Sequence, residues 1–352
     1  MNERLRITCR ISGLIPALLV AAGVAAAPPD GTAPARDIQR FEFAQMRMGV
    51  PFRITLYSSD EAVANNAARA AFARVKELNL LLSDYEPDSE LMQLCRRSAP
   101  ARPVEVSPEL FFVLERAVAL SKASDGAFDV TVGPIVQLWR EARHSRTLPD
   151  PEQLAAARSR VGWRSVRLDR ERRTVELLKP DMRLDLGGIA KGYAADEALR
   201  VLNEHGVTRA LIAAAGDIVA GDPPPDRDGW RIGIAPLDSP EGPPSRYLRL
   251  ENAAVSTSGD AFQYVEIEGV RYSHIVDPRT GLGLTTRSSV TVVARDGITA
   301  DSLASAASVL GPDRGLKLAG SYQGTAALFI VLEGDEQRTR ASASLKPYLE
   351  QP

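Results

Sequence analysis

Residues 184–196 read Leu-Asp-Leu-Gly-Gly-Ile-Ala-Lys-Gly-Tyr-Ala-Ala-Asp, and this stretch decides how the chain is organised. The apolar run from Met182 to Leu186 predicts a short strand that carries one acidic residue, Asp185. The run breaks at Gly187–Gly188, after which the spacing of apolar residues predicts a helix. Paired glycines at such a turn let backbone N–H groups approach an anion closely, and Lys191 adds a positive charge. The pattern suits a diphosphate; a tight turn followed by a surface lysine is the alternative.

A second pattern lies near the C-terminus, where residues 299–305 read Thr-Ala-Asp-Ser-Leu-Ala-Ser. A helix is predicted over 300–310, closed by Gly311–Pro312. Asp301 and Ser305 are four residues apart on it, so both side chains project from one face. Carboxylate and hydroxyl oxygens are hard donors that suit Mg²⁺, and a helix N-terminus favours a nearby phosphate. An aspartate that interacts with the helix dipole, beside a solvated serine, is the alternative.

Four further segments combine turn residues with groups that could contact a ligand, although ordinary turn chemistry also explains them. His274 could accept a proton or donate a hydrogen bond to a phosphate. Tyr85 could stack on a planar ring or close one edge of the core. The four segments are 82–91, 125–134, 255–260 and 273–281.

The bulk composition argues against several classes of function. The chain has 352 residues, of which 44% are apolar, and a formal net charge of -2. This is enough for a large core, and it provides no basic field that would attract nucleic acid. The sequence contains neither a Gly-x-Gly-x-x-Gly fingerprint nor a P-loop, so the common NAD and ATP folds are not supported. Its three histidines and two cysteines form no zinc-binding pattern.

The N-terminal segment is typical of an export signal. Three arginines within the first ten residues precede an apolar run from Ile11 to Val20, and small residues follow as far as Ala27. We therefore expect residues 1–27 to be a signal peptide and the protein to be periplasmic, with an uncleaved membrane tether as the alternative. Residues 28–40 are rich in Pro and Ala and are expected to be a linker. The folded unit is expected over 41–352.

Strands and helices are mixed along the rest of the chain without strict β–α–β alternation. We therefore expect an α+β fold with mixed, largely antiparallel sheets and packed helices. Besides the two helices above, helices are predicted over 61–82, 107–124 and 151–161. Further strands are predicted over 53–57, 164–168, 174–178, 210–215, 264–267, 270–276, 289–294 and 325–332.

Taken together and in this order, the six polar segments resemble the ApbE family of exported FAD:protein FMN transferases. The resemblance extends from about Met48 to the C-terminus. It is specific because several motifs agree in both sequence and spacing. These motifs are Tyr-x-Pro-Asp-Ser-Glu-Leu, Gly-Ala-Phe-Asp-x-Thr-Val-Gly-Pro, Asp-Leu-Gly-Gly-Ile-Ala-Lys-Gly-Tyr, Ser-Thr-Ser-Gly-Asp, Ser-His-Ile-x-Asp-Pro-Arg-Thr-Gly and Ala-Asp-x-Leu-x-Ser.

The resemblance implies a role for each matching residue. Mg²⁺ would be held by Asp301, Ser305 and the backbone carbonyl of Gly188. His274 would lie near the diphosphate, and either His274 or Asp301 would accept a proton. The residues implied to contact FAD are Met48, Tyr85, Ala127, Phe128, Asp129, Asp185, Lys191 and Ile275.

The implied activity is Mg²⁺-dependent transfer of the FMN moiety of FAD to a Ser or Thr hydroxyl of a target protein, with release of AMP. The expected acceptors are flavoprotein subunits of exported or membrane electron-transfer systems. Two alternatives would use the same site. One is a pyrophosphatase that splits FAD into FMN and AMP with water, and the other is a periplasmic FAD-binding protein without catalysis.

The chain departs from the family pattern at several positions, which affect packing at the flavin edge and leave the metal-binding residues intact. Members commonly have Thr where this chain has Val50, and Gly where it has Ala215. They often have Asn at the position of Cys95, and Thr at that of Ser305. After Leu138-Trp139, the usual Gly-Phe-Gly is replaced by Arg140-Glu141-Ala142.

Overall fold

The computed structural model describes residues 37–239, 241–260, 263–334 and 336–350. The predicted signal peptide, residues 1–27, lies outside them. The first strand, β1 (Gln39–Arg47), overlaps the last two residues of the predicted linker, 39 and 40. Within the described part of the chain, no helix is both long enough and apolar enough to cross a membrane.

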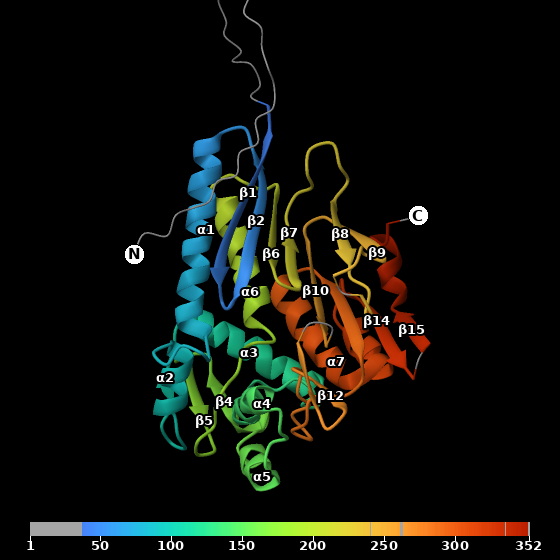
Figure 1. Ribbon diagram of the computed structural model, residues 1–352. Helices are drawn as coiled ribbons and strands as arrows, with labels where there is room; N and C mark the ends of the chain where they lie inside the picture. Colours follow the sequence, from blue (N-terminus) through green and yellow to red (C-terminus); the bar gives the residue numbers. More distant parts are fainter. Residues whose placement is uncertain (1–36, 240, 261–262, 335, 351–352) are drawn as a thin grey trace, which may run out of the picture.

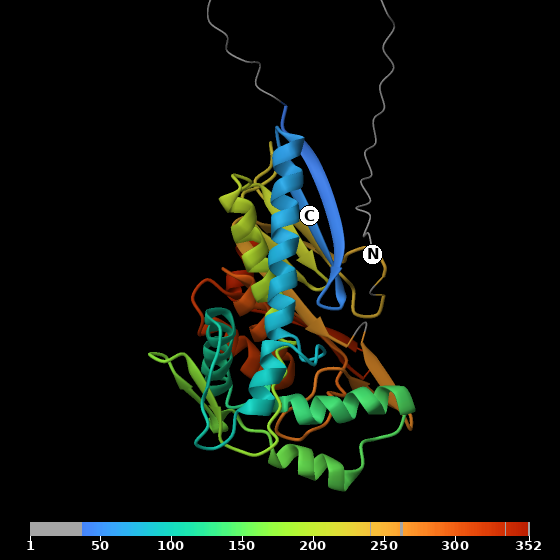
Figure 2. The ribbon, with the colours of Figure 1, turned by 90° about the vertical axis from the view of Figure 1, so that its left-hand side faces the viewer.

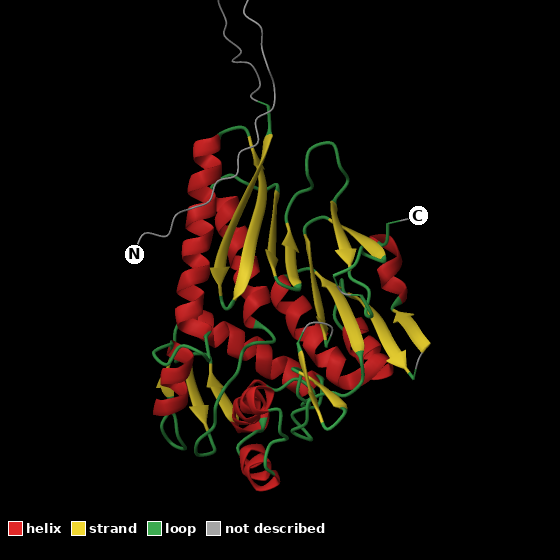
Figure 3. Cartoon of the chain, viewed as in Figure 1, coloured by secondary structure: helices red, strands yellow, loops and turns green. Residues whose placement is uncertain are grey.

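An eight-stranded sheet forms the centre of the molecule (Figures 1 and 3). Every strand pairs antiparallel with its neighbours. Strands β13 and β14 are buried along most of their length, whereas β1 and β15 form the two edges. In spatial order the strands are β1, β2 (Val50–Ser58), β6 (Ala210–Ala214), β7 (Asp217–Ala220), β10 (Ala253–Gly259), β13 (Ser288–Ala294), β14 (Ala326–Glu333) and β15 (Glu336–Ala341).

Three helices cover one face of the sheet: α1 (Glu61–Leu82), α6 (Ala190–Glu204) and α7 (Gly297–Gly320). Figure 2 shows α1 running alongside the β1–β2 hairpin. The bounds of α1 are those that the spacing of apolar residues predicts. The helix begins there because the carboxylate of Asp60 accepts hydrogen bonds from two N–H groups of the first turn and so caps the helix. The buried faces of these helices and of the sheet form the main hydrophobic core.

Helix α7 is longer than predicted and contains a kink. Its first turn is capped by Asp296, whose side chain accepts a hydrogen bond from the N–H of Thr299. The predicted end at Gly311 is the position of the kink, where the backbone takes φ 74° and ψ 176°. Pro312 then starts a second helical stretch, which continues to Gly320. Gly311 can adopt this left-handed φ because it has no Cβ.

The opposite face of the sheet is partly covered by the β8–β9 hairpin (Trp230–Ile234 and Arg246–Leu250) and the 3₁₀ segment Ala343–Tyr348. Below the sheet in Figure 1 lies a smaller layer of short helices and hairpins. Its helices are α2 (Glu90–Arg97), α3 (Pro108–Ala123), α4 (Gly133–Ser145) and α5 (Pro151–Ser159). Its strands are β3 (Val104–Glu105), β4 (Val166–Asp169), β5 (Thr174–Leu177), β11 (Tyr264–Ile267) and β12 (Val270–Ser273).

The α+β class with a largely antiparallel sheet is confirmed, and one predicted strand is wrong. Residues 182–186 form no strand, and within this run the N–H of Asp185 bonds to the Val130 carbonyl. Strand β12 also ends three residues earlier than predicted, at Ser273. The hydroxyl of Ser273 accepts the N–H of Ile275 and turns the chain there.

Candidate functional site

The two patterns singled out in the sequence meet at one place, where the start of α6 contacts the start of α7. The N–H of Gly192 donates to Oδ2 of Asp301 at 3.0 Å. A Cβ at Gly188 would lie 2.9 Å from Oγ of Ser305 and 3.4 Å from the Phe128 ring. Glycine is required at 192, since a Cβ there would lie 2.1 Å from the backbone carbonyl oxygen of Gly297. The segments can approach this closely because both glycines lack a side chain.

The carbonyl of Gly188, just before α6, is left without a donor. Gly192 lies in the first turn of α6, where backbone N–H groups have no partner within the helix. Its N–H bonds to Asp301 of α7, while Ala190 donates to Leu186 and Tyr193 to Ile189. Among the described residues, no group donates to the Gly188 carbonyl, so its oxygen is free to bind a ligand.

Two side-chain oxygens of α7 are free in the same way. Oδ1 of Asp301 has no partner among the described residues, although the residue is only 2% exposed. The hydroxyl of Ser305 also makes no hydrogen bond to a described residue. By contrast, Ser302 and Ser308 on the same helix each donate to the carbonyl four residues before them. Three hard oxygens are thus left without protein partners beside the Gly187–Gly188 turn, and this donor set fits Mg²⁺.

A half-buried lysine, Lys191, lies between two buried carboxylates at the same place. Nζ of Lys191 lies 2.9 Å from Oδ2 of Asp217 and 3.5 Å from Oδ2 of Asp301. It also donates to the Gly187 carbonyl at 3.1 Å. Burial alone would lower the pKa of Lys191, but the two carboxylates outweigh it and raise that pKa, so the lysine is a cation. Burial and then Asp217 raise the pKa of Asp301 to about 7, against the effect of Lys191.

Asp217 and Ser256 extend this network and were not among the predicted site residues. The hydroxyl of Ser256 donates to Oδ1 of Asp217 at 2.6 Å, and the two residues are register partners of β10 and β7. Asp217 therefore holds Lys191 with one oxygen and Ser256 with the other. Asp217 starts one strand, and Ser256 faces it from the neighbouring strand. The sequence shows the two residue types, but their pairing is visible only when the register of the strands is known.

The predicted flavin residues Tyr85 and Asp185 lie together around one arginine. Nη2 of Arg140 lies 2.6 Å from Oδ2 of Asp84 and 3.2 Å from Oδ2 of Asp185. Its guanidinium carbon lies 3.9 Å from the centre of the Tyr85 ring. The other oxygen of Asp185 accepts the N–H of Gly187 at 2.7 Å. Arg140 and Asp84 were not predicted as site residues.

Residues 127–129 connect this region to a neighbouring cavity. Phe128 contacts Gly188, and Ala127 beside it is buried. The carboxylate of Asp129 accepts hydrogen bonds from the hydroxyl and N–H of Thr131 and from the N–H of Trp163. Burial raises the pKa of Asp129 despite these bonds. The cavity, of about 440 Å³, is lined by residues of two predicted segments, including Asp125, Gly126, Asp129, Pro278 and Arg279.

The remaining predicted residues lie in turns at the edge of the site. His274 is partly buried, and both its N–H and its ring Nδ1 lie 3.1 Å from the carbonyl oxygen of Gln263. Burial lowers the pKa of His274, and the positive charges of Arg143 and Lys191 lower it further. Ile275 follows it in the turn. Met48, at the β1–β2 turn, has φ 49° and packs against the main core.

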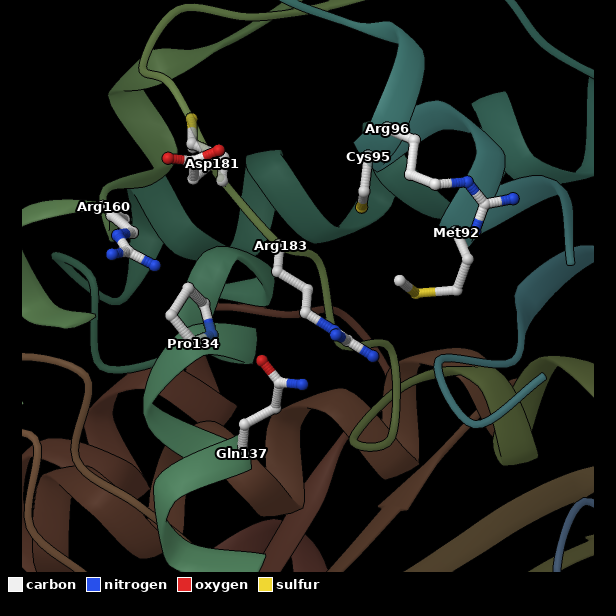
Figure 4. A pocket seen from close by; sticks show the side chains of 9 residues that line it. Met92, Cys95, Arg96, Pro134, Gln137, Arg160, Asp181 and Arg183 are labelled. Atoms are coloured by element: carbon white, nitrogen blue, oxygen red, sulfur yellow. The ribbon is translucent and has the colours of Figure 1, made fainter. Parts of the chain in front are cut away.

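A second, smaller cavity lies behind the Asp84 loop. It measures about 210 Å³ and is lined by residues that include Cys95, Arg96, Gln137, Arg160 and Arg183 (Figure 4). This volume is below the 300–1,000 Å³ typical of small-molecule pockets. Arg183 donates to the backbone carbonyl of Asp84, so the cavity wall supports the loop that carries Tyr85.

Comparisons with known proteins agree on one family. The sequence model of the ApbE family matches residues 48–329. A protein of Klebsiella pneumoniae (strain 342), described as an FAD:protein FMN transferase, is 31% identical over 86% of this chain and 87% of its own length. One of Treponema pallidum (strain Nichols), described in the same words, is 33% identical over 88% of each chain. The solved structure of the flavin transferase ApbE from Vibrio cholerae superposes with a TM-score of 0.80, at 31% identity, over 89% of this chain and 100% of its own.

Proposed function

The chain belongs to the ApbE family, and from this premise we propose that it is an FAD:protein FMN transferase that attaches FMN to a Ser or Thr hydroxyl of a target protein. The observation that carries the proposal is the set of three free oxygens at Gly188, Asp301 and Ser305. They lie beside a glycine turn and a half-buried lysine, which together suit the diphosphate of a dinucleotide. The acceptors we propose are flavoprotein subunits of exported or membrane electron-transfer systems.

In the proposed reaction, the acceptor hydroxyl oxygen forms a bond to the FMN-side phosphorus of FAD. The bond between that phosphorus and the bridging oxygen breaks, and AMP leaves with that oxygen. The products are a protein–FMN phosphodiester and AMP. As in other phosphoryl transfers, the rate gain comes mainly from positioning and from neutralising charge.

The chain's own residues supply most of this positioning. The N–H groups of Gly188 and Lys191 donate to no described residue, and the start of α6 favours an anion at this end of the helix. Asp217 keeps Lys191 protonated and holds its side chain in place. Asp301, Ser305 and the Gly188 carbonyl would hold Mg²⁺, which when bound stabilises negative charge on the diphosphate.

His274 is the base we propose for the acceptor hydroxyl. Its lowered pKa keeps the imidazole neutral, and therefore able to accept a proton, at neutral pH. Asp301 is the weaker candidate, because its Oδ2 is already bonded to Gly192 and its Oδ1 is a proposed metal ligand. Ring Nδ1 faces the Gln263 carbonyl, which leaves Nε2 to take up the proton.

The decisive experiment is in-gel flavin fluorescence of a co-expressed acceptor, with wild type and with Asp301→Asn. The Asn variant keeps an oxygen that can accept the Gly192 N–H but removes the charge, so it tests the metal assignment without removing the helix contact. We expect attachment with wild type and Mg²⁺, and none with the variant. Retained attachment in Asp301→Asn contradicts the metal assignment.

The same purified protein separates the two alternative functions. Incubation with FAD and Mg²⁺ without any acceptor, followed by an assay of AMP, measures hydrolysis. Rapid AMP release without acceptor would favour a pyrophosphatase. Stable binding of FAD with no turnover in the presence of any acceptor would favour a carrier.

We also propose that the protein works after export, in the periplasm. The support is the basic, apolar and small-residue pattern of residues 1–27. N-terminal sequencing of the protein recovered from a periplasmic fraction tests this. A mature N-terminus near residue 27 is expected, and an intact Met1 in a membrane fraction indicates a tether.

A further inference from the structure

Arg140 joins three segments that are far apart in the sequence. It extends from α4 to Asp84 in the loop between α1 and α2, to Asp185 before the glycine turn, and to the ring of Tyr85. Its side chain is 22% exposed, whereas those of Asp84 and Asp185 are 9% and 10% exposed. The cation is therefore largely removed from water. Its interactions with the carboxylates and the ring are stronger in this place than they would be at the surface.

The Tyr85 ring is held by this arginine and is otherwise open. The side chain is among the most exposed large hydrophobic groups of the described chain, at 71%. One face of its ring lies over the Arg140 guanidinium, and no other aromatic ring in the described residues stacks on it. A planar ring fixed on one side and exposed on the other provides a stacking surface for a flat ligand.

The arginine also keeps two carboxylates together. Burial and the nearby Asp185 carboxylate raise the pKa of Asp84 to about 6, and Arg140 opposes this rise. Without the guanidinium, two like charges in a largely buried place would repel each other. Nε of Arg140 is buried and makes no hydrogen bond to a described residue, so the contacts that fix this side chain are the two carboxylates and the ring.

We propose that Arg140 is a positioning residue for the isoalloxazine ring of FAD, because it fixes the Tyr85 ring and the Asp185 carboxylate at the place where the flavin binds. The inference rests on the proposed function. It concerns a position at which this chain departs from the residues that are common in the family.

The effect of Arg140 is expected to be confined to the flavin half of the substrate. The N–H of Gly187 donates to Oδ1 of Asp185, which is only two residues away in the sequence. This bond forms a local turn that does not depend on Arg140. The diphosphate region should therefore survive the loss of Arg140. ADP, which has the adenosine and diphosphate but no flavin ring, is the matched reference ligand.

The experiment compares Arg140→Ala, Arg140→Lys, Tyr85→Ala and the double variant Arg140→Ala/Tyr85→Ala with wild type. We expect Arg140→Ala to raise the KM for FAD by about 10-fold, the scale of a partly desolvated cation–π contact, with kcat within about 3-fold. Inhibition by ADP should be unchanged. Arg140→Lys keeps the charge but loses the planar guanidinium, so its effect should be intermediate.

The double variant shows whether Arg140 acts through Tyr85. If it does, Arg140→Ala should have little further effect on FAD binding once Tyr85 is alanine. Quenching of the fluorescence of bound flavin should fall in both single variants. Arg170→Ala is the control, since it removes an exposed arginine that pairs with Glu115 and with no member of this cluster.

Three outcomes would overturn the inference: an unchanged KM for FAD in Arg140→Ala, equal weakening of FAD and ADP, or full additivity in the double variant. If Arg140→Ala does not fold, Arg140→Lys supplies the same comparison. Failure of the proposed function is distinguishable. In that case wild type transfers no flavin, while titration with FAD and ADP still measures what Arg140 contributes to binding.

Discussion

The N–H of Gly192 donates to Oδ2 of Asp301, a residue 109 positions away in the sequence. This bond joins the first turn of α6 to the carboxylate of α7. Together with the close approach of Gly188 to Ser305, it brings the glycine turn and the start of α7 to one place.

Gly192→Ala should damage both stability and activity. The added Cβ would lie 2.1 Å from the Gly297 carbonyl oxygen and 2.8 Å from Cβ of Asp301, so the two helices must move apart. Overpacking of this kind costs about 1–3 kcal/mol of unfolding free energy, which urea denaturation measures. Gly320→Ala is the control, because nothing lies within 4 Å of its Cβ position. Equal stability and activity of both variants would contradict the proposed contact.

Ser305→Ala should change the need for Mg²⁺ without changing stability. Its hydroxyl makes no hydrogen bond to a described residue, so the unfolding free energy should stay within about 0.5 kcal/mol of wild type. The Mg²⁺ concentration for half-maximal flavin attachment should rise about 10-fold, the effect of about 1.4 kcal/mol of lost binding. Ser302→Ala removes a hydroxyl that is bonded within the helix and should leave the Mg²⁺ requirement unchanged.

Lys191→Met should destabilise the protein when no divalent cation is present. It leaves the carboxylates of Asp217 and Asp301 buried together without their cation, which we expect to cost about 2–4 kcal/mol. The double variant Lys191→Met/Asp217→Asn removes one of the two charges and should recover part of this loss. Urea denaturation in EDTA is the measurement. A double variant less stable than the single one would show that repulsion between the carboxylates is not the cause.

The pH dependence of flavin attachment should follow His274. A base acts when it is unprotonated, and burial lowers the pKa of His274 below the ordinary value. The rate should therefore stay constant across neutral pH and fall only below about pH 6.5, as the imidazole takes up a proton. His274→Gln should lower kcat and abolish this acidic limb. An unchanged pH profile in the variant would assign the limb to another group.

The order of helices and strands could be predicted where a local signal was strong. The spacing of apolar residues predicted a helix over 61–82, and α1 has these bounds, with Asp60 as its N-terminal cap. The run 182–186 has the apolar content of a strand but lacks a partner, and strand pairing is a tertiary property. The stretch of α7 beyond Gly311 was missed because Gly-Pro commonly ends a helix, whereas here Pro312 starts a new one.

The site could be predicted only in part, for a similar reason. Asp301 and Ser305 share a face because of helix periodicity, which the sequence displays directly. The pairing of Asp217 with Ser256 depends on the register between β7 and β10, and the contacts of Arg140 depend on how α4 lies against two loops. No periodicity connects such residues, so they became visible only with the fold.

The break at Gly311 separates α7 into two parts that need not unwind together. Fraying of a helix spreads through consecutive hydrogen bonds, and the reversed φ at this glycine interrupts that series. Thermal opening that begins at the Gly320 end should therefore stop ten residues short of Asp301. Hydrogen exchange would then be slow in residues 300–310 and faster after the break. The first turns of α7, which carry Asp301 and Ser305, would stay ordered while the far end of the same helix opens.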